Sequence, residues 1–86
     1  MKIQFSPEAF DDLLHWVTIG EHRTFRKIHR LITDIQRDPE NPGLGKPERL
    51  KAPLAGWLSR RITQEDRLVY RIEGDTLLVI SARGHY

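Results

Sequence analysis

The sequence has 86 residues, which is enough for one domain with one modest hydrophobic core. It contains no cysteine, and this excludes disulfides, thiolate catalysis and thiolate-rich zinc sites. Its 14 Lys and Arg residues exceed its 12 Asp and Glu residues only slightly, but clusters of arginine favour a polyanionic partner. We expect a single cytoplasmic domain over residues 1–86, with neither a signal peptide nor a membrane-spanning segment.

The first part of the chain predicts a strand and a helix. Residues 2–5 alternate polar and apolar side chains, as a short strand does. Ser6-Pro7-Glu8 is typical of a helix start, because it offers a capping hydroxyl, a proline at the first helical position and an acid in the first turn. The helix is predicted to end at Gly20 and to bury an apolar stripe made of Phe10, Leu13, Leu14 and Val17.

A second helix is predicted to extend to about Arg37, where Asp38-Pro39 ends it. Its apolar positions recur with helical spacing at Phe25, Ile28, Leu31, Ile32 and Ile35. Its outer face is basic, with Arg23, Arg26, Lys27 and Arg30. The two helices, joined near Gly20, should form an antiparallel hairpin on one side of a sheet.

The rest of the chain predicts a loop followed by a sheet. Three prolines and two glycines make residues 38–48 a loop, which leads into Lys46-Pro47-Glu48-Arg49-Leu50-Lys51. Leu50, Leu54 and Trp57 are expected to return to the core. Residues 57–86 predict three strands separated by turns at 64–66 and 73–75. This order indicates an α+β domain, with two N-terminal helices packed on one face of a mostly antiparallel, twisted sheet.

Arginines recur along the predicted sheet, so at least one of its faces offers guanidinium groups to an anion; they are Arg60, Arg61, Arg67, Arg71 and Arg83. Arg61 and Arg67 flank the first turn, and a register that brings them close would form a fork for phosphate oxygens. Arg60 is expected to bind RNA on the same surface. Salt bridges to Glu65, Asp66 or Glu73 are the alternative.

The residues favour cleavage of RNA without a metal or other cofactor. The four histidines lack the spacing of a metal site, and RNA supplies its own 2′-hydroxyl nucleophile. The protein then needs a base, an acid and positive charge. His85 is the candidate acid, because imidazole exchanges protons near neutral pH. Glu48 is the candidate base, held ionised by the basic residues around it, and Tyr86 is suited to stack on a nucleobase.

Several separated motifs carry a resemblance to a known family. They are Gly45-Lys46-Pro47-Glu48, Gly56-Trp57, Ser59-Arg60-Arg61-Ile62-Thr63, Asp66-Arg67-Leu68-Val69-Tyr70 and His85-Tyr86. In this order the motifs resemble the YoeB/Txe toxins of bacterial toxin–antitoxin pairs, within the RelE-like superfamily. The resemblance implies a microbial-ribonuclease-like fold and an mRNA endonuclease that acts in the ribosomal A site.

The resemblance also implies roles and partners. Glu48 matches the base, His85 the acid, Arg67 the residue that stabilises the phosphate and Tyr86 a residue that places the substrate. Lys51 and Arg61 match basic residues that hold RNA. A homodimer and a Phd/YefM-type antitoxin are implied as well.

The sequence departs from the family pattern at Leu58, Asp66 and Gly84, where a tryptophan, a histidine and an aromatic residue are common. Asp66 is expected to neutralise Arg67 in part, and Gly84 to loosen the catalytic tail. Two other functions fit the same arginines. One is a non-catalytic module that binds RNA or the ribosome and blocks translation by occupancy, and the other is a protein-interaction domain for an acidic partner.

Overall fold

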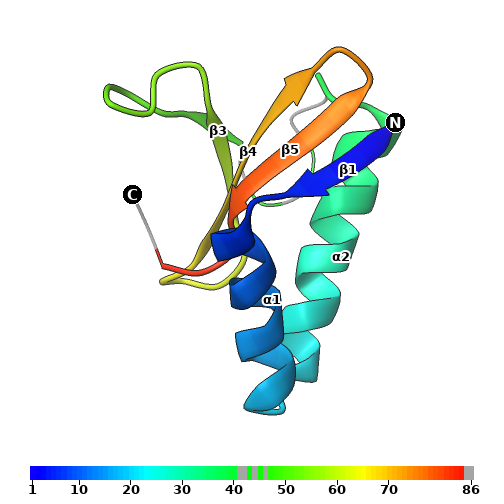
Figure 1. Cartoon of the computed structure of the whole chain (residues 1–86), viewed down its shortest axis with the longest axis vertical. Coiled ribbons are helices and arrows are strands. Elements are labelled where there is room, and N and C mark those ends of the chain that lie inside the picture. The colour runs from blue at the N-terminus through cyan, green and yellow to red at the C-terminus, as the bar shows by residue number, and fades with distance from the viewer. Residues whose placement is uncertain (41–42, 44, 46, 85–86) are drawn as a thin grey trace.

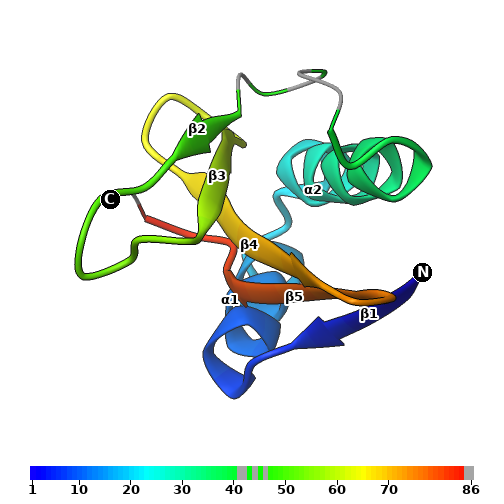
Figure 2. The ribbon, with the colours of Figure 1, turned by 90° about the horizontal axis from the view of Figure 1, so that it is seen from above.

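The computed structural model describes residues 1–40, 43, 45 and 47–84. Its elements follow the order β1 (Lys2–Phe5), α1 (Pro7–Thr18), α2 (His22–Arg37), β2 (Glu48–Arg49), β3 (Leu58–Arg61), β4 (Arg67–Glu73) and β5 (Thr76–Ser81). The five strands form one sheet in the order β1-β5-β4-β3-β2. The β1–β5 pair is parallel and the other pairs are antiparallel. Figure 2 shows the strands fanning out with the twist usual for such a sheet.

The two helices form the predicted antiparallel hairpin and lie side by side in Figure 1. Their buried apolar residues and four residues of β4 and β5 belong to one hydrophobic cluster, so both helices cover the same face of the sheet; the strand residues are Leu68, Tyr70, Leu77 and Val79. The predicted fold class is confirmed. No helix among the described residues is long and apolar enough to cross a membrane.

Helix α1 begins as predicted but turns a different side to the core. The Ser6 hydroxyl accepts a hydrogen bond from the Ala9 amide at 3.1 Å, and Pro7 is the first helical residue. The predicted buried stripe is wrong at three positions, because Phe10 is 62% exposed, and Leu14 and Val17 are exposed as well. The buried residues are Ala9 and Trp16, with Leu13 partly buried beside them.

Two hydrogen bonds from α1 to the end of the sheet account for this orientation. The Trp16 indole N–H donates to the Ala82 carbonyl oxygen at 2.9 Å, and the Asp12 carboxylate accepts from the Ala82 amide at 2.9 Å. Ala9, Asp12 and Trp16 follow the spacing of one helix face. That face therefore meets the sheet, and the more apolar set around Phe10 points away.

Helix α2 matches its prediction closely. Ile28, Leu31, Ile32 and Ile35 are buried, Phe25 lies at the border of exposure, and the helix ends at Arg37. The predicted return of Leu50, Leu54 and Trp57 to the core is wrong. These three side chains are half-buried and outside the core cluster, and the Trp57 ring instead packs 4.6 Å from the guanidinium of Arg71.

Candidate active site

The face of the sheet opposite the helices gathers several of the predicted site residues. Glu48 of β2 pairs with Ser59 of β3, and Arg61 of β3 pairs with Arg67 of β4. Paired residues project to the same face, and so do residues two apart on one strand. The four side chains therefore share one face, and the register pairs Arg61 with Arg67, as the expected fork for phosphate oxygens requires.

Arg67 is held beside the carboxylate of Glu48. Its Nε donates to the Ser59 hydroxyl at 2.8 Å, and its Nη2 lies 3.7 Å from Glu48 Oε2. Nη2 is buried and donates no hydrogen bond within the described part of the chain. The Arg67 side chain is only 11% exposed, whereas that of Glu48 is 63% exposed. A fixed guanidinium thus stands next to a carboxylate that solvent and a ligand can reach.

The loop after β2 forms a hollow beside this pair. The hollow has a volume of about 690 Å³ and is lined by residues 48–54, which include Glu48 and Lys51. Lys51 and Arg61 are both exposed, so their charges are available to a polyanion. Lys46, one of the residues expected to hold Glu48 ionised, lies outside the described residues, while Arg67 is the cation paired with Glu48.

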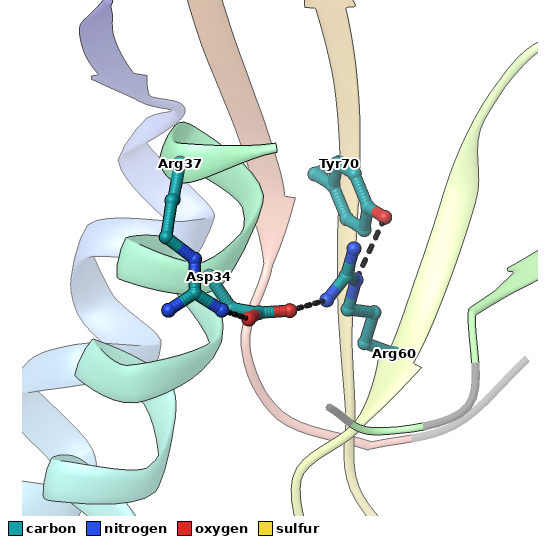
Figure 3. Close-up of polar contacts among 4 residues, drawn as sticks. All are labelled: Asp34, Arg37, Arg60 and Tyr70. Atoms are coloured by element: carbon teal, nitrogen blue, oxygen red, sulfur yellow. Dashed lines mark hydrogen bonds and ion pairs between the residues drawn. The ribbon is translucent and has the colours of Figure 1, made fainter. Parts of the chain in front are cut away.

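Arg60 is placed differently from its prediction. Its side chain is 0% exposed on the helix-facing side of the sheet, where Nη1 donates to Asp34 Oδ2 at 2.6 Å and Nε donates to the Tyr70 hydroxyl at 3.0 Å (Figure 3). The other oxygen of Asp34 accepts from Arg37 Nη2 at 2.6 Å. The prediction that Arg60 binds RNA is therefore wrong, because its guanidinium joins α2 to the sheet inside the molecule.

The sequence did hold a signal for this network. Asp34 lies among the buried positions of α2, directly before Ile35, and a carboxylate there needs a cationic partner. Strand alternation is a second signal, because Arg60 and Arg61 are consecutive and must face opposite sides of the sheet. Neither signal identifies the partner without the three-dimensional arrangement.

His85 and Tyr86, the predicted acid and its neighbour, lie outside the described residues. Gly84, the last described residue, is held by two hydrogen bonds. The Gly84 amide donates to Asp66 Oδ1 at 2.8 Å, and the Gly84 carbonyl oxygen accepts from the Arg67 amide at 2.7 Å. Asp66, which was expected to neutralise Arg67 in part, directs its carboxylate to Gly84 and to the Thr63 hydroxyl.

No cluster of three or more metal-binding side chains occurs within the described ranges of the chain. Residues 5–86 match the model of the "YoeB-like toxin of bacterial type II toxin-antitoxin system". The chain belongs to the YoeB toxin family. The resemblance noted in the sequence is confirmed.

Relatives and solved structures agree with this assignment. The YoeB toxin of Escherichia coli K12 is 48% identical over 86 residues, with full coverage of both chains. The solved YoeB/ParE toxin from Agrobacterium tumefaciens superposes with a TM-score of 0.92 at 44% identity and full coverage. The YoeB of Staphylococcus aureus, at 38% identity and covering 100% of this chain and 98% of its own, was solved as a dimer with a TM-score of 0.90. It was also solved in a heterotetrameric complex with YefM, with a TM-score of 0.89.

Proposed function

We propose that this YoeB-family chain is a ribosome-dependent endoribonuclease that inhibits translation by cutting mRNA in the ribosomal A site. The observation that carries the proposal is the Glu48–Arg67 pair, in which Nη2 of the fixed arginine lies 3.7 Å from the exposed carboxylate. This arrangement sets a proton acceptor beside a cation whose Nη2 donates to no group in the described part of the chain. Such a pair is suited to a reaction in which a phosphate gains charge while a hydroxyl loses a proton.

In the proposed reaction the Glu48 carboxylate takes the proton of the RNA 2′-hydroxyl. The 2′-oxygen then forms a bond to the adjacent phosphorus, and the bond from phosphorus to the 5′-oxygen breaks. The leaving 5′-oxygen receives a proton from the His85 imidazolium. The products are a 2′,3′-cyclic phosphate and a 5′-hydroxyl, so the reaction consumes no water and requires neither a metal nor another cofactor.

The remaining predicted residues act on the substrate. Arg67 stabilises the charge that develops on the phosphate. Its Nε is already fixed by Ser59, so the side chain loses little conformational freedom when RNA binds. Lys51 and Arg61, both exposed near Glu48, hold the RNA backbone. Tyr86 places the substrate by stacking on a base. Arg60 has no part in binding.

Partners follow from the relatives. The dimer and the YefM complex of the Staphylococcus aureus protein support a homodimer and a YefM-type antitoxin for this chain. The ribosome and its mRNA place the activity in the cytoplasm. Size-exclusion chromatography with light scattering, on the chain alone and with its antitoxin, tests both assemblies.

The deciding experiment maps mRNA 5′ ends in a cell-free translation reaction, with and without ribosomes. The wild type should produce new ends only when ribosomes are present, and His85→Ala should lower the cleavage rate by about 10² or more. His22→Ala is the matched control, because it removes an imidazole from the exposed start of α2 and should leave cleavage unchanged. Translation arrest without new ends would instead establish the non-catalytic module that acts by occupancy.

A further inference from the structure

The carboxylate of Asp66 fixes the peptide that precedes His85. Oδ1 accepts from the Gly84 amide at 2.8 Å, and Oδ2 accepts from the Thr63 hydroxyl at 2.6 Å. Thr63 Oγ1 in turn accepts from the amides of Glu65 at 3.2 Å and Asp66 at 3.0 Å. The turn between β3 and β4 thus orients the Asp66 carboxylate that binds Gly84.

Gly84 is held on its other side as well. Its carbonyl oxygen accepts from the Arg67 amide at 2.7 Å, and its φ of 78° lies in the left-handed region that glycine adopts readily. The residues that bind Gly84 are consecutive, and one of them carries the guanidinium proposed to stabilise the phosphate. Ala82, two residues earlier, is held by Asp12 and Trp16 of α1. The backbone that leads to His85 is therefore fixed from two sides of the molecule.

We propose that Asp66 is a positioning residue: it fixes the Gly84 peptide beside Arg67 and so limits the positions from which the acid that follows Gly84 in the sequence can act. The inference rests on the proposed function and adds a residue to it. Proton transfer requires the acid within hydrogen-bond reach of the leaving oxygen, and a misplacement of about 1 Å costs up to about 10² in rate. Asp66 and Gly84, two departures from the family pattern, are thus hydrogen-bonded to each other.

A purely electrostatic role for Asp66 makes a different prediction, because a carboxylate beside Arg67 would only weaken the attraction for RNA. Four variants separate the two roles. Asp66→Ala removes both the charge and the acceptor, Asp66→Asn keeps an oxygen acceptor without the charge, and Thr63→Val keeps the charge but removes the hydroxyl that orients it. Glu65→Ala, at an exposed neighbouring position, removes the same charge and is the matched control.

Single-turnover and steady-state cleavage of ribosome-bound mRNA give the kinetic test. Positioning predicts that Asp66→Ala lowers kcat by about 10 to 10² with little change in KM. It also predicts that Thr63→Val lowers kcat in the same direction, that Asp66→Asn recovers most of the rate, and that Glu65→Ala matches the wild type. The electrostatic role predicts that Asp66→Ala and Asp66→Asn change KM equally and leave kcat unchanged, and that Thr63→Val changes neither. That result would overturn the proposal. If Asp66→Ala does not fold, Thr63→Val decides.

Amide hydrogen exchange of Gly84, followed by NMR in the isolated wild-type protein, gives a test that needs no activity. The amide should be protected in the wild type and in Glu65→Ala, and lose protection in Asp66→Ala and Thr63→Val. An unprotected Gly84 amide in the wild type would overturn the proposal. Failure of the proposed function is recognised separately, because wild-type protein would then produce no new mRNA ends while Gly84 stays protected.

Discussion

At the residue scale, Gly45 packs tightly against both α2 and β3. Its φ is 80°, and its carbonyl oxygen accepts from the Arg61 amide at 2.7 Å. A Cβ at this position would lie 2.9 Å from Leu31 Cδ2 and 3.0 Å from both Arg60 Cβ and the Arg61 carbonyl oxygen. Gly45 thus lies in direct contact with the core and with β3, the strand that carries Arg61.

We predict that Gly45→Ala lowers the free energy of unfolding for two reasons. The left-handed backbone costs an alanine about 1–2 kcal/mol, and the close contacts add about 1–3 kcal/mol. Gly20→Ala is the control, because Gly20 has a similar φ of 76° but nothing within 4 Å of its Cβ position, so only the backbone cost applies. Urea denaturation measures both, and equal losses in the two variants would contradict the packing argument.

At the element scale, the ion pair between Asp34 and Arg60 joins α2 to β3. We predict that Asp34→Ala lowers the free energy of unfolding by about 3–5 kcal/mol, because it leaves the fully buried guanidinium without this partner. Arg37→Ala removes a second cation that binds the same carboxylate, but the Arg37 side chain is 74% exposed, so its loss should cost less than about 1 kcal/mol. Thermal unfolding followed by circular dichroism checks the pair. A small effect of Asp34→Ala would mean that Arg60 finds another partner.

The elements also show what the sequence could predict. The boundaries of α1, the end of α2 and the buried positions of α2 follow from helix start and stop signals and helical spacing, and the structure agrees. The buried side of α1 does not follow from spacing, because hydrogen bonds from Asp12 and Trp16 to Ala82, 70 and 66 residues away in the sequence, decide it. A pattern within one helix holds no information about such a distant partner.

For the candidate site, the sequence proposed members but not their arrangement in space. The resemblance supplied Glu48, Arg67 and Arg61, but only the strand register places them on one face. Arg60 was expected to bind RNA like Arg61 because both are arginines of the same strand. Consecutive residues of a strand face opposite sides of the sheet, so one of the two lies on the surface and the other in the core. The role of Asp66 in binding Gly84 was missed, since it depends on the last described residues returning beside the turn between β3 and β4.

At the scale of the whole molecule, the sheet depends on its first strand. β1 pairs in parallel with β5, and the Ser6 amide and hydroxyl bind the carbonyl oxygens of Val79 and Ile80. We predict that deleting residues 2–5 abolishes cooperative unfolding and promotes aggregation, because it leaves β5 with an open edge. Differential scanning calorimetry and light scattering test this.

The control for the deletion is Asp75→Ala, which removes only the ion pair to the N-terminal ammonium, 3.6 Å away. Because the Asp75 side chain is largely exposed, this variant should unfold almost like the wild type. A deletion variant that still unfolds in one sharp transition near the wild-type temperature would show that β1 is dispensable.

The position of β5 in the sheet has a consequence for the synthesis of the protein. β5 comes last among the strands in sequence, yet it lies between β1 and β4 and contributes Leu77 and Val79 to the core. A nascent chain that has grown only to Asp75 lacks the strand that joins its beginning to the rest, so it cannot close its core. The fold can form only after residues 76–81 have been synthesised. Prematurely terminated products therefore carry no assembled site.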